Sequence, residues 1–187
     1  YWVTYSEIVR MAGGNVKFVN TSVKNGYKIT PAELEGAITE RTKLFMFSSP
    51  CNPTGAVYSK EELIGLAGVF KKYPNIFIMS DEIYEYINYE GKHESIAQFD
   101  FLKDRVVIIN GLSKGFAMTG WRLGFIAAPV EIATRKNAPA GSGAFPVIAQ
   151  LTPSAANPPA NPIAAPQHGG QSPLGSVPTI GLLNTKL

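Results

Sequence analysis

Residues 76–84 are Ile-Phe-Ile-Met-Ser-Asp-Glu-Ile-Tyr, four apolar residues that lead directly into polar ones. A short continuous apolar run is typical of a strand buried on both faces, and such strands belong to parallel sheets covered by helices. Asp81 follows this run, where an ionised carboxylate is costly unless it is paired. The stretch therefore predicts a buried strand whose carboxyl end carries either a functional acid or a turn residue.

Strands and helices are expected to alternate on both sides of this stretch. Apolar runs predict further strands at residues 16–19, 43–48, 105–109 and 123–128. Capping boxes that begin at Thr30 and at Ser59 each predict the start of a helix. This order indicates an α/β fold with a mostly parallel sheet flanked by helices.

Polar side chains follow three of the expected strands. They lie in Asn52-Pro53-Thr54-Gly55, in Asp81-Glu82-Ile83-Tyr84, and in Ser113-Lys114 with Arg122 eight residues on. Ligands of such sheets bind beyond the carboxyl ends of the strands, so the three motifs predict one site. Each motif alone has an ordinary alternative, namely a turn asparagine, an N-cap or turn aspartate, or a solvated loop lysine beside a surface arginine.

The ordered set resembles the fold-type I pyridoxal-phosphate enzymes, the aspartate aminotransferase-like family. The resemblance covers residues 1 to about 133, and these residues would form part of the large, cofactor-binding domain. The stretch Ala117-Met118-Thr119-Gly120-Trp121-Arg122 is most similar to the bacterial aspartate aminotransferases.

The resemblance implies pyridoxal 5'-phosphate as cofactor, with Lys114, Asp81 and Tyr84 as the catalytic residues. Lys114 would hold the cofactor as a Schiff base, which requires a lysine pKa lowered by burial near cations such as Arg122. Asp81 would face the protonated pyridine nitrogen, so that the ring accepts electrons. Arg122 would bind the phosphate through two charge-assisted hydrogen bonds.

Further contacts would complete this cofactor site. Tyr84 and Asn52 would both hydrogen-bond the ring oxygen, or Asn52 the substrate carboxylate, and a cis Asn52–Pro53 peptide is expected. Trp2 would stack on the ring, with core packing as its alternative. Ser113 would bind the phosphate, whereas Gly111 stands where many relatives have a serine.

The implied reaction moves an amino group from an L-amino acid, with aspartate first, to a 2-oxo acid such as 2-oxoglutarate. Other pyridoxal-phosphate reactions, such as β-elimination or synthase chemistry, would use the same residues. An inactive fragment that keeps the cofactor motifs is a further alternative, because the full-length parent is expected to be a homodimer whose partner subunit and N-terminal phosphate loop complete the site.

Composition excludes several other classes. Residues 1–133 are neutral overall, so the net charge of +3 lies in residues 134–187 and favours neither nucleic acid nor membrane partners. The single cysteine, Cys51, fits a reducing compartment, and a cytoplasmic protein is expected. His93 and His168 have no ligand-like spacing, so both are expected to be solvated and no metal site is predicted. Glu82 is expected to be a solvent-side or ion-pair carboxylate.

Residues 134–187 depart from the pattern. They contain 9 prolines, 6 glycines and no acidic residue, which is typical of a low-complexity tail. The sequence therefore predicts a partial large domain at 1–133 and a Pro/Gly/Ala-rich tail at 134–187. This tail would be disordered or not coded by the family at all, for example through a shifted reading frame.

Overall fold

The computed structural model describes residues 1–89 and 91–133, so the predicted tail and His168 lie outside the described residues. The described helices are α1 (Thr4–Met11), α2 (Pro31–Ala37), α3 (Lys60–Lys72) and α4 (Val130–Ala133). Short 3₁₀ turns are η1 (Val23–Asn25), η2 (Ile96–Gln98), η3 (Asp100–Arg105) and η4 (Thr119–Trp121). The strands are β1 (Leu44–Ser48), β2 (Phe77–Asp81), β3 (Val106–Gly111) and β4 (Gly124–Ala127).

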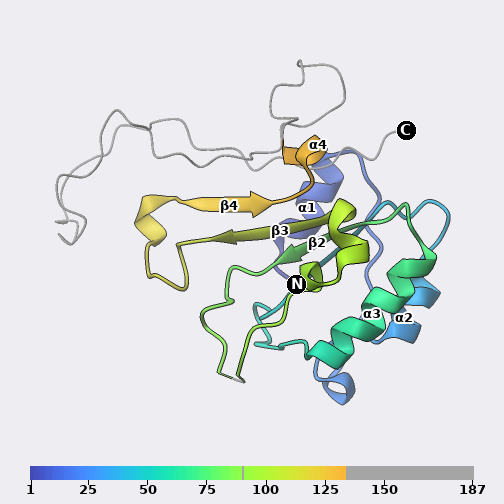
Figure 1. Cartoon of the computed structure of the whole chain (residues 1–187), viewed down its shortest axis with the longest axis horizontal. Helices are drawn as coiled ribbons and strands as arrows, with labels where there is room; N and C mark the ends of the chain where they lie inside the picture. Colours follow the sequence, from blue (N-terminus) through green and yellow to red (C-terminus); the bar gives the residue numbers. More distant parts are fainter. Residues whose placement is uncertain (90, 134–187) are drawn as a thin grey trace.

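The four strands form one sheet in the order β1-β2-β3-β4. β1, β2 and β3 are parallel, and β4 pairs with β3 in the antiparallel direction, as Figure 1 shows. The expected mostly parallel α/β sheet is therefore confirmed. The carboxyl ends of β1, β2 and β3 lie at one edge of the sheet, which is the edge predicted to carry the site.

The helices at the predicted capping boxes are confirmed in detail. The Thr30 side chain accepts from the backbone N–H of Glu33 at the start of α2, and Ser59 accepts from that of Glu62 at the start of α3. At the other end of α3, Arg105 donates from Nη2 to the carbonyl of Phe70 at 2.8 Å and thereby caps the helix. Each end of α3 is thus satisfied by a side chain.

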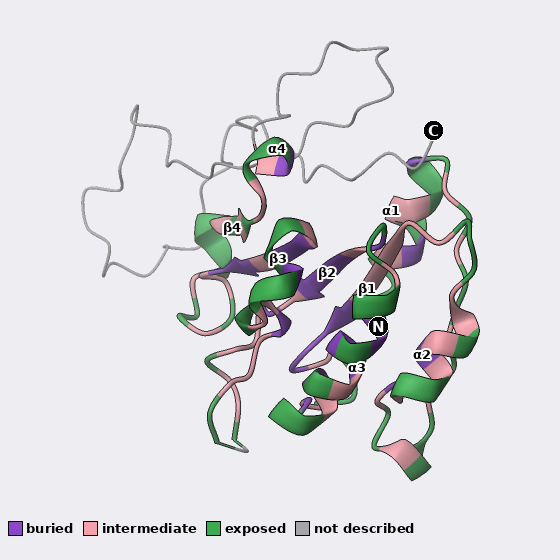
Figure 2. Cartoon of the chain, turned by 45° about the vertical axis from the view of Figure 1, so that its right-hand side comes forward, coloured by how far each residue is buried: buried purple, intermediate pink, exposed green. Residues whose placement is uncertain are grey.

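The sheet has two faces that pack against different elements. Because side chains alternate along a strand, Ile78 and Ser80 of β2 share one face while Phe77, Met79 and Asp81 share the other. Ile78 belongs to a large core cluster with Leu63, Leu66 and Phe70 of α3, so we call this the α3 face. The other face carries Asp81, which accepts a hydrogen bond from Tyr5 of α1, so we call it the α1 face. Figure 2 shows β1 and β2 between these two helices.

One expected strand is wrong. Residues 16–19 are not in a strand, and no described strand pairs with them. Val19 packs instead against the core cluster of the α3 face, and Lys17 donates from Nζ to the carbonyl of Ala37 at 2.8 Å. An apolar run becomes a strand only when another strand supplies the ladder of backbone hydrogen bonds.

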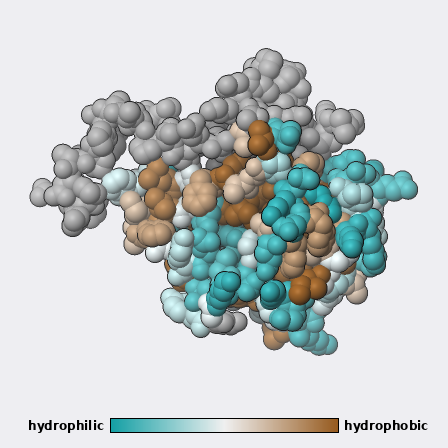
Figure 3. Space-filling view, viewed as in Figure 1, coloured by the Kyte–Doolittle hydropathy of each residue, from teal (hydrophilic) through white to brown (hydrophobic). Residues whose placement is uncertain are grey.

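Two surface properties follow from this architecture. Within the described residues, no helix is long and apolar enough to cross a membrane. The chain from the end of β3 into β4 carries three exposed aromatic side chains, Phe116, Trp121 and Phe125. Figure 3 shows hydrophobic and hydrophilic side chains side by side on the face in view.

Candidate active site

The three sequence motifs lie at the carboxyl ends of three neighbouring parallel strands. Asn52 follows β1, Asp81 is the last residue of β2, and Lys114 comes three residues after β3. Since these ends share one edge of the sheet, residues up to 62 positions apart in sequence come to the same place.

The loop after β1 directs Asn52 toward the motif that follows β2. The Asn52–Pro53 peptide is cis, which confirms the expectation. The turn is closed by the backbone N–H of Gly55, which donates to the carbonyl of Cys51 at 2.7 Å. Asn52 then donates from Nδ2 to the hydroxyl of Tyr84 at 3.3 Å.

Tyr84 also contacts Lys114, so it links all three motifs. The Lys114 Nζ lies 5.7 Å from the centre of the Tyr84 ring, which is within the range of a cation–π contact. Tyr84 itself sits in a turn that is closed by the backbone N–H of Ile87 donating to its carbonyl at 2.8 Å. The structure therefore brings Asn52, Tyr84 and Lys114 into one group.

The surroundings of Lys114 differ from the expectation. Its side chain is exposed, whereas the Schiff-base role predicted a buried amine. The lysine lies in the loop between β3 and η4, where its Nζ lies near the Tyr84 ring. Within those residues it makes no ion pair.

Asp81 has a partner that the sequence did not reveal. The hydroxyl of Tyr5, in α1, donates a short hydrogen bond to Asp81 Oδ2, and the backbone N–H of Ile83 donates to Oδ1 at 3.1 Å. Burial raises the pKa of Asp81, and these two hydrogen bonds oppose that rise because they favour the ionised form. Burial and the neighbouring carboxylate raise the pKa of Tyr5 well above its usual value, so Tyr5 keeps its proton and remains the donor.

Sequence reasoning missed both Tyr5 and the helix that carries it. Tyr5 lies 76 residues from Asp81, and nothing in the local pattern indicates that the two meet. The only available signal was that Tyr5 belongs to the aromatic segment 1–5, in which Trp2 alone was selected.

Within the described part of the chain, Trp2, Ser113 and Arg122 make no hydrogen bond or ion pair with Asn52, Asp81, Tyr84 or Lys114, although the carbonyl of Trp2 accepts from the backbone N–H of Tyr5 at 3.1 Å. Trp2 is 50% exposed, so core packing does not account for it. Arg122 is exposed, has φ of 52°, and donates from Nη1 to the carbonyl of Thr119 at 3.2 Å. A positive φ is uncommon for a residue with a side chain, so the turn holds Arg122 in an unusual conformation. The cofactor roles of these three residues stay predictions.

The glycine at position 111 has a steric reason. A Cβ at Gly111 would lie 2.8 Å from the carbonyl oxygen of Leu123 and 2.9 Å from the Cα of Gly124. Gly124 is the first residue of the antiparallel neighbour β4 and pairs with Gly111, and Leu123 directly precedes it. A serine at position 111 would therefore need the backbone of residues 123 and 124 to move away from β3.

Glu82 and His93 differ from their expected exposed positions. Glu82 is only 3% exposed, and its carboxylate accepts from Ser80 Oγ at 2.9 Å and from Ser95 Oγ at 2.7 Å. His93 is largely buried and its Nε2 lies 2.8 Å from Glu82 Oε2. The solvent-side option for Glu82 is wrong, and its carboxylate instead contacts His93, which is an ion pair when the imidazole is protonated. A solvated His93 is also wrong, because its partner is a buried carboxylate.

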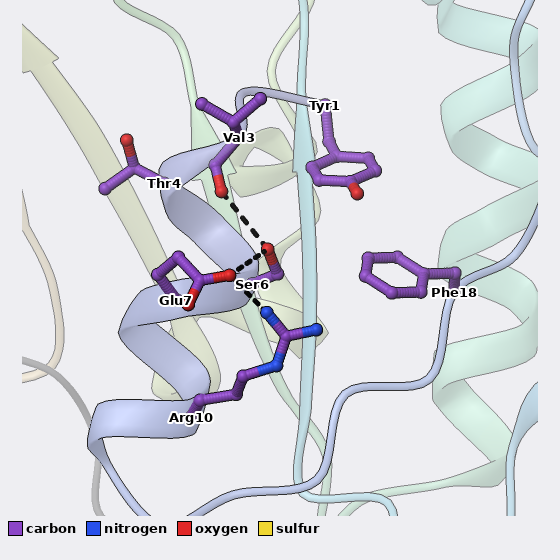
Figure 4. Close-up of a pocket in the computed structure, with 7 residues that line it drawn as sticks. All are labelled: Tyr1, Val3, Thr4, Ser6, Glu7, Arg10 and Phe18. Carbon is purple, nitrogen blue, oxygen red and sulfur yellow. Dashed lines mark hydrogen bonds and ion pairs between the residues drawn. The ribbon is translucent and has the colours of Figure 1, made fainter.

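Two other features of the described residues bring polar side chains together. Glu82, Glu85 and His93 place one potential metal ligand each within 4.8 Å of one another, but the oxygens of Glu82 already accept three hydrogen bonds. An open hollow beside α1 is lined by Tyr1, Val3, Thr4, Ser6, Glu7, Arg10 and Phe18. In Figure 4 its polar side chains bond one another, with Arg10 paired to Glu7 and Ser6 bonded to both Glu7 and the carbonyl of Val3. Neither feature includes Asn52, Asp81 or Lys114.

Comparison with known proteins gives a consistent result. Residues 1–160 match the family described as aminotransferase class I and II. The chain is 46% identical over 136 residues to the aspartate/prephenate aminotransferase of Nitrosomonas europaea, and 50% identical over 134 residues to the aspartate aminotransferase of Bacillus subtilis. These alignments cover 72% and 71% of this chain and 34% of each relative, so the chain spans about a third of their length.

Solved structures are similar as well. The aspartate aminotransferase of Thermus thermophilus with maleate matches with a TM-score of 0.66 and 45% identity, over 70% of this chain and 34% of that one. The aspartate aminotransferase of Rhizobium meliloti matches with a TM-score of 0.68 and 38% identity, over 70% and 33%.

Proposed function

The chain belongs to the class I and II aminotransferases, and from that premise we propose that its protein transfers an amino group from an L-amino acid to a 2-oxo acid with pyridoxal 5'-phosphate. The observation that carries the proposal is the group of Asn52, Tyr84 and Lys114 at the sheet edge that also ends in Asp81. Aspartate is the first candidate donor, because similar chains are aspartate aminotransferases. A homodimer is part of the proposal.

The charges at the edge fit this cofactor. Asp81 is partly buried and hydrogen-bonded, yet no Lys, Arg or His pairs with it among residues 1–89 and 91–133. A protonated ring nitrogen would supply the missing positive charge. Lys114 and Arg122 are cations without a carboxylate partner in the same described part, and they suit an aldehyde and a phosphate.

We assign the residues to the cofactor as follows. Lys114 would bind its aldehyde carbon and Asp81 its ring nitrogen. Tyr84 and Asn52, which already bond each other at 3.3 Å, would share its ring oxygen. A further set would hold the phosphate and cover the ring, namely Arg122, Ser113 and Trp2. When bound, the cofactor supplies a Schiff-base linkage to Lys114 and a ring that accepts electrons from the substrate's α-carbon.

The residues of the chain would then perform the proton chemistry. The Lys114 amine would remove the proton from the α-carbon of the amino acid. Among the described residues, Lys114 is the lysine whose amine lies against the Tyr84 ring at this edge. Asp81 would remain ionised, since Tyr5 and Ile83 donate to both its oxygens. Tyr84 would keep its hydroxyl directed by the Asn52 amide, which restricts where a bound ring oxygen can lie.

A labelling experiment tests the assignment. The purified protein is mixed with pyridoxal phosphate, reduced with borohydride, digested, and analysed by mass spectrometry. We expect the pyridoxyl label on Lys114, loss of the label in Lys114→Ala, and an unchanged label in the control Lys24→Ala, which removes another exposed lysine. Equal labelling of many lysines in all three proteins would contradict the proposal, because it would show that Lys114 is not selected.

A further inference from the structure

Glu82 is the most fully bonded buried carboxylate of the described chain. Its carboxylate has three hydrogen-bond partners. Ser80 belongs to β2, which directly precedes Glu82, whereas His93 and Ser95 belong to the loop that returns to the core. A buried carboxylate is tolerated only when such donors replace water. The contact between Glu82 and the pair His93 and Ser95 therefore holds the strand end and the returning loop together.

This contact lies on the face of the sheet opposite the Asp81 side chain. Side chains alternate, so Glu82 points to the α3 face while Asp81 points to Tyr5 on the α1 face. The peptide that links Asp81 and Glu82 is hydrogen-bonded to the chain on both sides of β2. The N–H of Glu82 donates to the carbonyl of Ile109 at 2.8 Å, and the carbonyl of Asp81 accepts from the N–H of Ser49 at 3.1 Å. Fixing the Glu82 side chain therefore restricts the direction of the Asp81 side chain.

The same contact closes the segment that carries Tyr84. The chain turns after β2, where the N–H of Glu85 donates to the carbonyl of Glu82 at 2.9 Å, and it returns at His93. Ser95 caps η2 through the N–H of Ala97 at 3.2 Å and anchors Ile96, which is 1% exposed. Residues 82–95 are thus closed at their base by the Glu82–His93–Ser95 contact, which we call the clamp.

We infer that His93 and Glu82 are positioning residues whose clamp holds Asp81 and Tyr84 in their site positions and weakens as the imidazole loses its proton. The inference rests on the proposed function, because there Asp81 and Tyr84 contact the cofactor. It assigns no chemical step to His93 itself, which touches Glu82 and not the site residues.

The electrostatics support this direction. The hydrogen bond with Glu82 raises the pKa of His93, burial opposes the rise, and the nearby charges of Glu82, Glu85 and Glu94 add to it. A histidine whose folded pKa is raised contributes stability that is complete below its unfolded value, about 6.5, and is lost as pH rises through the folded pKa. The clamp should therefore be strongest in weak acid and weaker in alkali.

The substitution His93→Gln separates charge from hydrogen bonding. Glutamine keeps a neutral N–H donor at about the reach of Nε2 but cannot become a cation. At pH 9 the variant should resemble the wild type, and at pH 6 it should lose the charge-assisted part of the bond. We expect its dissociation constant for pyridoxal phosphate to exceed that of the wild type about fivefold at pH 6 and less than twofold at pH 9. The other histidine provides the control, since His168→Asn should leave both ratios near one.

The pH dependence of this ratio is the decisive readout. A purely structural role of the imidazole would raise the dissociation constant equally at both pH values, and that result would overturn the inference. A ratio near one at both pH values would overturn it as well.

A second readout needs no cofactor. Amide hydrogen exchange of residues 82–89 reports how often the segment opens, and opening should be about fivefold more frequent in His93→Gln than in the wild type at pH 6 only. If the wild type fails to bind pyridoxal phosphate, the proposed function fails while this readout still decides the inference. Exchange ratios that do not change with pH would contradict the inference even if the cofactor binds.

Discussion

The α3 face and the α1 face of the sheet differ in how much the described residues cover them. Fourteen buried residues form one cluster on the α3 face, and Leu63, Leu66 and Phe70 are completely buried in it. The buried cluster with Val107 and Ile132 has only these two members. Figure 2 shows buried residues along β1, β2 and β3 and within α3.

Stability and chemistry are therefore placed on different sides of the same strands. The α3 face buries apolar area, which is the main favourable term in folding. The α1 face and the adjoining carboxyl edge hold the polar groups of the candidate site, such as Asp81 and Lys114, beside a smaller apolar cluster. Substitutions on the α3 face should therefore change folding, and substitutions at the edge should mainly change binding.

The largest expected effect is a cavity on the α3 face. Phe70→Ala should lower the free energy of unfolding by about 3–5 kcal/mol, because Phe70 is 0% exposed and its neighbours can close the space only partly. Urea denaturation followed by circular dichroism measures the change. The control Met11→Ala removes a side chain that is 80% exposed and should change the free energy by less than about 0.5 kcal/mol. Equal losses in both variants would remove the contrast between the faces.

The adjacent acids at the end of β2 sharpen the comparison. Glu82→Gln should lower the free energy of unfolding by about 2 kcal/mol, because it weakens three hydrogen bonds to a buried charge. Asp81→Asn should change it by less than about 1 kcal/mol, since Asp81 has no cationic partner among the described residues and burial already disfavours its charge.

Binding should show the reverse order for these two substitutions. Asp81→Asn should abolish the retention of pyridoxal phosphate on gel filtration, whereas Glu82→Gln should reduce it only partly. The same ranking of the two variants in stability and in binding would show that the two faces do not divide these tasks.

The sequence predicted the parts of this fold that depend on neighbouring residues. The capping boxes at Thr30 and Ser59 and the apolar runs of β1 to β4 are local patterns, and the structure confirms them. The burial of the Glu82 side chain depends on the loop that returns at His93. No local sequence pattern could predict that contact. The strand expected at 16–19 failed for the same reason, because a strand requires a partner from elsewhere in the chain.

The candidate site divides in the same way. Asn52, Asp81 and Lys114 could be selected because each follows an apolar strand in a recognisable motif. Tyr5 could not, because its contact with Asp81 forms only when α1 packs on the sheet.

The smallest effect concerns this contact between Tyr5 and Asp81. Tyr5→Phe removes the hydroxyl that donates to Asp81 and leaves the ring in place, so the lost stability should be about 1 kcal/mol at pH 7.

The hydrogen bond from Tyr5 lowers the pKa of Asp81, so its removal lets burial raise that pKa further. A raised carboxyl pKa means that the folded chain holds the proton more tightly than the unfolded chain, and the ionised form then costs stability above the unfolded value of about 3.8. The difference in unfolding free energy between Tyr5→Phe and the wild type should therefore shrink as pH falls through the raised pKa of folded Asp81, and little of it should remain below about 3.8. Urea denaturation at pH 7 and pH 3.5 measures it, with Tyr89→Phe as the control because Tyr89 is 92% exposed. A loss that is the same at both pH values would mean that the Tyr5 hydroxyl stabilises the fold independently of the charge on Asp81, and that the α1 face contributes no electrostatic support to Asp81.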